Sequence, residues 1–339
     1  MLIERHASWI ALNNIVGCPN NCKYCFLQER SCRPKIISNP MQAVEQLIKS
    51  DKYKEDIPIC LMPNTDAFAT LSNKRQLFLV CNMLKRKRIK NLIVIITKRE
   101  INDRDCLFIK GLRNKGLNIC VYVSYSGLDD QFEKGVRKNN QLEVISSMKN
   151  LKRYNIPCIH YWRPLLPQNT NVEILKTVLN TVRKYCFASC MTGLKLYPDM
   201  SCKEYWPEVQ NLFDKGVNPE CFVPKMAFDN IIKLAKEVRY RVFIDNVCLL
   251  ASLQKKACEY GNYQSYRCNK YNMCSNEQRL ICGKFYHFEK PEQICLENNI
   301  SMDVLLDMLK KQKVSALNQK MKNATYWQNS FTSDKWIEL

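Results

Sequence analysis

The stretch Gly17-Cys18-Pro19-Asn20-Asn21-Cys22-Lys23-Tyr24-Cys25-Phe26-Leu27-Gln28 places three thiols within eight residues, directly after an apolar segment. Cys18, Cys22 and Cys25 have the spacing C-x3-C-x2-C, so one loop supplies three metal ligands. Zinc sites usually combine paired C-x2-C sets with four protein ligands, whereas three clustered thiolates can hold three irons of a cubane and leave the fourth open. The alternatives are a zinc site with a distant fourth ligand and plain buried cysteines, although core packing has no need of this spacing.

The composition is that of a globular protein. With 339 residues and 46% hydrophobic content, the chain can bury the core of one catalytic domain and a smaller appendage. Nineteen cysteines would suggest a disulfide scaffold in a short secreted chain, but the N-terminal residues lack the apolar core of a signal peptide. No apolar run approaches the ~18 residues needed to cross a bilayer. We therefore expect a cytoplasmic protein with reduced thiols and no membrane partner.

The chain is strongly basic, with a net charge of +20 and a pI near 9.2. A polyanionic partner would be bound through the release of its counterions. A composition that is generally rich in Lys and Asn explains the charge equally well. Charge alone therefore does not identify nucleic acid as the substrate.

Short apolar runs alternate with helical patterns about every thirty residues, which predicts right-handed crossovers and a parallel sheet. The expected strands are 8–16, 57–62, 91–97, 117–124, 157–163 and 192–197. The expected helices are 40–48, capped by Asn39, and 103–114, capped by Asn102, with further helices at 74–86, 141–154 and 172–185. Six such units predict an α/β fold, a partial (β/α)6 TIM-type barrel, whose chemistry lies at the carboxyl ends of the strands.

Three regions are expected along the chain. Residues 1–200 form the barrel core, 201–247 extend the barrel, and 248–339 form a Cys-rich C-terminal extension that binds metal. The extension has four cysteines with the spacing C-x9-C-x5-C-x7-C, namely Cys258, Cys268, Cys274 and Cys282. Four soft ligands suit either a second iron-sulfur cluster or zinc, and incidental thiols are the remaining interpretation.

The segment from Cys22 to Gln28 resembles the cysteine loop of the radical S-adenosylmethionine (SAM) enzymes, and in particular of their spore photoproduct lyase-like branch, often named DNA repair photolyases. Three later segments are similar to those that follow the second, third and fifth strands in this branch, namely Thr65-Asp66-Ala67-Phe68, Ile96-Thr97-Lys98 and Arg163-Pro164-Leu165-Leu166-Pro167. The likeness covers roughly residues 10 to 200.

The resemblance implies a 4Fe-4S cluster on Cys18, Cys22 and Cys25. It also implies that SAM is bound by six further side chains, namely Tyr24, Thr65, Asp66, Lys98, Ser124 and Arg163. Tyr24 would lie against the adenine, and Lys98 would face the carboxylate of SAM. A solvated lysine and ordinary strand-end hydroxyls are the alternatives for Lys98, Thr65 and Ser124, and Asp66 either bonds a ribose or caps the following turn.

The expected function is that of a radical SAM enzyme. Such an enzyme reductively cleaves SAM to a 5'-deoxyadenosyl radical, which abstracts hydrogen from a substrate. The electron would come from a reductant such as flavodoxin or ferredoxin. The branch and the basic charge favour a nucleic acid or nucleotide as the substrate. The alternatives are a peptide-modifying enzyme with an auxiliary cluster and a non-catalytic module that binds metal and nucleic acid.

The sequence departs from spore photoproduct lyase in two places. That enzyme has a cysteine ahead of the Ser-Asp pair after its second strand, where this chain has Pro63-Asn64, and the nearest thiol is Cys60. Its tyrosine after the third cluster cysteine is replaced by Phe26, whose ring has no hydroxyl hydrogen to transfer. We therefore predict that this protein does not split spore photoproduct, which an assay of thymine recovery from irradiated DNA would test.

Overall fold

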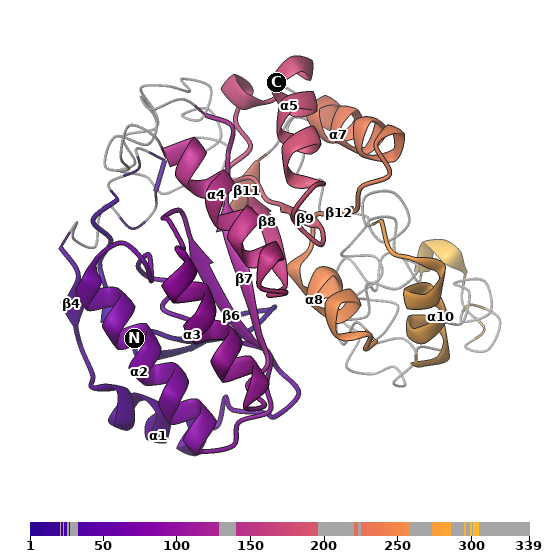
Figure 1. The fold of residues 1–339 in the computed structure, drawn as a ribbon. Coiled ribbons are helices and arrows are strands. Elements are labelled where there is room, and N and C mark those ends of the chain that lie inside the picture. Colours follow the sequence, from indigo (N-terminus) through magenta and orange to yellow (C-terminus); the bar gives the residue numbers. More distant parts are fainter. Residues whose placement is uncertain are drawn as a thin grey trace, which may run out of the picture. The chain divides into compact units, whose positions relative to one another are not determined.

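The structure is a computed structural model that describes residues 1–20, 22, 24, 25, 27, 33–128, 140–195, 220–222, 225–257, 273–285, 295, 299 and 301–304 (Figure 1). The described residues up to Tyr240 form one compact unit, and those from Arg241 onward form a second. The three expected regions, with divisions after residues 200 and 247, stay predictions. Within the described residues, no helix is both long and apolar enough to cross a membrane.

The first unit is built on a mostly parallel sheet in which the order of the strands follows the chain. The strands are β1 (Ile3–Arg5), β2 (Ile10–Leu12), β5 (Ile59–Leu61), β6 (Ile93–Thr97), β7 (Ile119–Ser124), β8 (Cys158–Trp162) and β9 (Ser189–Met191). The pairs from β2 to β9 are parallel, and β1 is added antiparallel to β2. In this sheet the strands from β2 to β9 are buried, which explains their nearly continuous apolar sequences, whereas β1 at the edge of the sheet is partly exposed.

The helices of the first unit follow the strands in the same order. They are α1 (Pro40–Lys49), α2 (Leu71–Arg86), α3 (Asp103–Asn114), α4 (Asn140–Arg153), the short 3-10 helix η2 (Pro167–Asn169), α5 (Val172–Val182) and α7 (Lys225–Glu237). From α1 to α5 each α-helix packs on the next, and α5 packs on α7 (Figure 1). Each crossover leads to the next strand in the same direction along the sheet, so the helices lie on one face of it.

An aromatic contact shows that this sheet curls toward a barrel. Trp9 precedes β2, and Tyr122 lies three strands away on β7, a separation of about 14 Å along a flat sheet. The centroids of their rings are nevertheless only 6.2 Å apart, in an edge-to-face contact. Both side chains therefore occupy the concave face of a curved sheet. The fold is a partial barrel, as the sequence predicts, and its carboxyl edge is where the candidate site is sought.

Two of the expected strands differ in the structure. The expected strand 8–16 breaks after β2, because Ile15–Val16 leave the sheet as β3 and pair antiparallel with β4 (Lys35–Ile36). The expected strand at 192–197 is wrong. The strand that pairs with β8 is β9, through the register of Trp162 with Met191, and Leu194–Lys195 form β10, which pairs antiparallel with β11 (Glu220–Phe222).

The second unit contains β12 (Val242–Phe243), α8 (Asn246–Gln254) and α10 (Asn276–Phe285). β12 is short because the chain turns into α8, where Asp245 caps the start of the helix by accepting a hydrogen bond from the Val247 N–H at 2.8 Å.

Candidate functional site

The cysteine loop connects β3 to β4. These two short strands pair antiparallel, with Val16 opposite Lys35. Gly17 follows β3 with φ of 87°, a left-handed conformation that favours glycine, and its N–H donates to the Asn64 carbonyl at 3.1 Å. The loop is thereby attached to the segment after β5, at the carboxyl edge of the sheet.

The three thiols of this loop differ in exposure. Cys22 is buried, whereas Cys18 and Cys25 are partly exposed. Burial first, and then the nearby Asp66 charge, raise the pKa of Cys18 to about 12, although the backbone N–H groups of Asn20 and Asp66 oppose this effect. Cys25 adds a smaller increase, so the first and third thiols of the loop interact electrostatically. Binding of a metal at Cys18 would therefore release a proton.

The donor set suits an iron-sulfur cluster chemically. Three thiols on one short loop are the ligands that such clusters take, and one cluster position would stay open for an outside ligand. In the described part of the chain, no three His, Cys, Asp or Glu side chains are gathered closely enough to hold a single metal ion. The fit therefore rests on the ligand chemistry and on the place of the loop in the fold.

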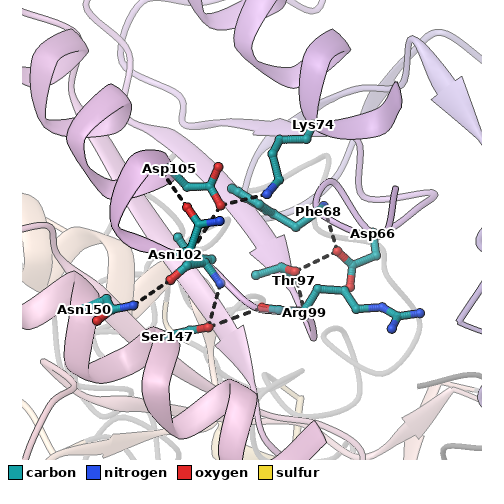
Figure 2. A network of polar contacts seen from close by, with 10 residues as sticks. Asp66, Phe68, Lys74, Thr97, Arg99, Asn102, Asp105, Ser147 and Asn150 are labelled. Carbon is teal, nitrogen blue, oxygen red and sulfur yellow. Dashed lines mark hydrogen bonds and ion pairs between the residues drawn. The ribbon is translucent and has the colours of Figure 1, made fainter. Parts of the chain in front are cut away.

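Asp66 links this loop to two strand ends. Asp66 is 5% exposed, and its carboxylate accepts hydrogen bonds from the Thr97 hydroxyl, at 2.7 Å, and from the Asn20 amide, at 2.9 Å. The backbone N–H groups of Phe68 and Lys98 complete four contacts, at 2.9 and 2.8 Å. Figure 2 shows the carboxylate facing Phe68 and Thr97. The contact with Phe68 is the turn cap that was one of the two interpretations of Asp66, and the ribose contact stays untested.

Thr65 is buried beside Asp66. Its hydroxyl oxygen accepts a hydrogen bond from the Asn73 amide at 3.2 Å, and the same amide donates to the Asp66 carbonyl at 2.8 Å. Asn73 lies in the first turn of α2, whose N-cap is Thr70. The segment between β5 and α2 is therefore held from the helix side. A contact of Thr65 with SAM stays a prediction.

Lys98 and Tyr24 lie together at the end of β6. The Lys98 ammonium is 5.2 Å from the centre of the Tyr24 ring, within the range of a cation-π interaction. Tyr24 belongs to the cysteine loop and is buried. The interpretation of Lys98 as an ordinary solvated lysine therefore overlooks a specific contact with this loop.

Ser124 and Arg163 lie at the ends of the next two strands. The Ser124 hydroxyl is 3.5 Å from the Arg163 carbonyl, and the Arg163 guanidinium donates to the Tyr161 hydroxyl at 3.0 Å. Ser124 pairs with Tyr161 in the β7–β8 register. The residues predicted for the first unit thus lie along one edge of the sheet, at or just after the ends of β3, β5, β6, β7 and β8.

Two other residues of these strands, one histidine and one cysteine, belong to the core. His160 is fully buried on β8, and both of its ring nitrogens have partners at 2.7 Å, the Ser189 hydroxyl and the Tyr125 carbonyl. Cys60 is fully buried on β5, and burial raises its pKa well above the ordinary value. Cys60 is therefore not placed to serve as an exposed hydrogen donor to substrate.

The C-terminal cysteines are only partly described. Cys274 is partly exposed, and Cys282 is buried on α10, where its sulfur lies 3.3 Å from the Gln278 amide nitrogen. Cys258 and Cys268 lie outside the described residues, as does Phe26 in the cysteine loop. A second metal site in this region stays a prediction.

Sequence reasoning missed two residues of the site. Asn20 and Arg99 are 79 positions apart, and the Arg99 Nε donates to the Asn20 side-chain oxygen at 2.7 Å. The one available signal is position, since Asn20 lies between two predicted ligands and Arg99 follows Lys98.

The chain thus has a parallel partial barrel with a cysteine-bearing loop at its carboxyl edge. No family model and no curated protein sequence matches it. Among solved structures, a variant of spore photoproduct lyase matches with a TM-score of 0.51 and 11% identity, over 69% of this chain and 75% of that one. The lyase in complex with dinucleoside spore photoproduct matches with the same TM-score and coverage at 10% identity. The fold is therefore like that of spore photoproduct lyase.

Proposed function

We propose that this protein is a radical SAM enzyme. Three ligand cysteines on a loop fastened to the carboxyl edge of a partial barrel support this proposal more than any other feature. Cys18, Cys22 and Cys25 would hold a 4Fe-4S cluster. When bound, the cluster supplies the electron that cleaves SAM to a 5'-deoxyadenosyl radical.

The chain's own residues would bind and orient SAM at this edge. The Lys98 ammonium is the charged donor for the SAM carboxylate, because a charge-assisted hydrogen bond is stronger than a neutral one. Tyr24, which Lys98 contacts, would place its ring beside the adenine. Thr65, Ser124 and Arg163 supply further polar groups on neighbouring strands.

Nucleic acid or a nucleotide is the proposed substrate class. The solved lyase with a similar fold carries a dinucleoside ligand, and the net charge of +20 favours a polyanion. Modification of a peptide is the second candidate, because Cys274 and Cys282 would allow an auxiliary cluster in the second unit. Flavodoxin or ferredoxin is the proposed reductant, and the cytoplasm the proposed location.

The test is the formation of 5'-deoxyadenosine from SAM by anaerobically reconstituted, reduced protein. We expect product from the wild type and none from Cys22→Ala. Cys81→Ala is the matched control, since Cys81 is a buried thiol on α2 and should leave the product unchanged. About four irons per chain indicate one cluster, and about eight indicate a second. Failure of the iron-loaded wild type to form 5'-deoxyadenosine would refute the enzyme proposal and favour a non-catalytic metal-binding module.

A further inference from the structure

The carboxylate of Asp66 has its acceptor positions filled by the chain itself. A carboxylate offers about four lone-pair positions for hydrogen bonds. One oxygen accepts from the Phe68 N–H and the Thr97 hydroxyl, and the other accepts from the Lys98 N–H and the Asn20 amide. Phe68 belongs to the segment after β5, Thr97 and Lys98 lie at the end of β6, and the fourth donor, Asn20, belongs to the cysteine loop.

Asn20 is held from both sides. It is 2% exposed and lies between Cys18 and Cys22. Its amide nitrogen donates to Asp66, and its oxygen accepts from the Arg99 Nε at 2.7 Å. Arg99 is itself fixed to the end of β6, since its backbone N–H donates to the Thr97 hydroxyl at 2.9 Å. Both amide atoms of Asn20 are therefore engaged by groups from the sheet edge.

A second contact fixes the other side of Cys18. The Gly17 N–H donates to the Asn64 carbonyl at 3.1 Å, so the two residues that bracket Cys18-Pro19 are both attached to the segment after β5. That segment turns at Met62, which has φ of 55°. The place of Cys18 is thus set by Asn64 and Asp66, which are distant from it in sequence.

We propose that Asp66 is the positioning residue of the cluster loop, and that it acts through Asn20 to hold Cys18 in place for iron binding. The inference rests on the proposed function and gives Asp66 a task other than contact with SAM. Mutation of a residue that orients a metal ligand commonly lowers metal affinity or activity by 10- to 100-fold. We expect an effect of this size here. When a cluster is bound, the negative charge of Asp66 beside Cys18 would also disfavour the addition of an electron to it.

The main variant is Asp66→Asn. The asparagine side chain has the shape of aspartate, but its amide NH2 group replaces one carboxylate oxygen that accepts hydrogen bonds. Its matched control is Asp105→Asn. Asp105 is equally buried, accepts from the Lys74 ammonium at 2.8 Å and from the Asn102 N–H at 3.2 Å, and has neither partner in the cysteine loop (Figure 2). Removal of either carboxylate should lower the unfolding temperature, so stability by itself does not separate the two roles.

The readouts are the affinity for iron and the properties of the reduced cluster. We expect Asp66→Asn to bind iron about 10- to 100-fold more weakly, and its remaining cluster to show an altered electron paramagnetic resonance spectrum and a higher midpoint potential. Asp105→Asn should match the wild type in all three. If Asp66→Asn does not fold, Asn20→Ala tests the same link, because it keeps the carboxylate and its other donors.

The double variant shows whether the two residues act together. If Asp66 acts through Asn20, the losses in iron affinity from the two substitutions should overlap instead of adding. Suppose that the wild type binds iron and that Asp66→Asn and Asn20→Ala have the same iron affinity and the same spectrum as the wild type. That result would overturn this inference and leave the proposed function standing. A wild type that binds no iron would refute the proposed function, and this inference with it.

Discussion

At the scale of single residues, His160 is the clearest example of a buried group with a fixed state. The Tyr125 carbonyl can only accept, so the ring nitrogen Nε2 carries the proton, and Nδ1 accepts from the Ser189 hydroxyl. The Ser189 hydroxyl also lies 3.2 Å from the hydroxyl of Tyr240, which extends the chain of polar groups. The pKa of His160 is lowered to about 4, chiefly by burial; the hydrogen bond to Tyr125 opposes this change, and the charge of Lys98 contributes to it.

This histidine predicts a dependence of stability on pH. Between pH 6.5 and 4 the unfolded chain binds a proton at His160 that the folded chain does not, so the free energy of unfolding falls as the pH falls. The free energy of unfolding decreases by about 3 kcal/mol over this pH range because of His160. Above pH 7 His160 causes almost no decrease. Urea unfolding of the apoprotein at several pH values measures this loss. His160→Gln, which does not titrate, should show a shallower decline, and equal slopes for the two proteins would contradict the prediction.

The residues of the site were predictable where one short segment carries the signal. Cys18, Cys22 and Cys25 are recognisable because their spacing puts three thiols in one loop. The link from Asn20 to Arg99 and Asp66 was not predictable, because it joins segments separated by 79 and 46 positions. The sequence contains no local pattern that brings such segments together.

At the scale of elements, helix starts were predictable for the same reason. Asn39 and Asn102 cap α1 and α3 as expected, since capping involves only the next three residues. The position of β9 was not predictable from the segment 189–197, because pairing with β8 selects Ser189–Met191. Leu194–Lys195, within the strand expected at 192–197, form β10 in a different, two-stranded sheet.

The capping box of α3 gives a prediction at this scale. The Asn102 side chain accepts from the Asp105 N–H at 3.1 Å, and the Asp105 carboxylate accepts from the Asn102 N–H at 3.2 Å. We expect Asn102→Ala to lower the free energy of unfolding by about 1 kcal/mol, and Asn102→Ser, which keeps an acceptor, to lower it by only a few tenths. Urea unfolding at pH 7 compares them. Equal losses in the two variants would show that the cap oxygen contributes nothing.

At the scale of the whole molecule, part of the basic charge has a structural explanation. Basic residues occupy the last turns of α1, α2, α3, α4 and α7, where cations interact favourably with the helix dipole. In a strand-helix barrel these helix ends lie at the edge opposite the candidate site. The charges that bear on a polyanionic substrate are therefore those at the carboxyl edge, such as Arg163.

A salt titration of DNA and RNA binding separates these two groups of charges. If a nucleic acid binds at the site, the logarithm of the affinity should fall linearly with the logarithm of the salt concentration, by about 0.7 to 0.9 for each phosphate contacted. Arg163→Gln should reduce this slope by about one contact, because its guanidinium lies at the carboxyl edge. Arg86→Gln, at the C-terminus of α2, should leave the slope unchanged. A shallow slope in the wild type would exclude a substrate bound through many phosphates and would favour the peptide alternative. A slope that changes in Arg86→Gln but not in Arg163→Gln would place nucleic-acid binding at the edge opposite the cysteine loop.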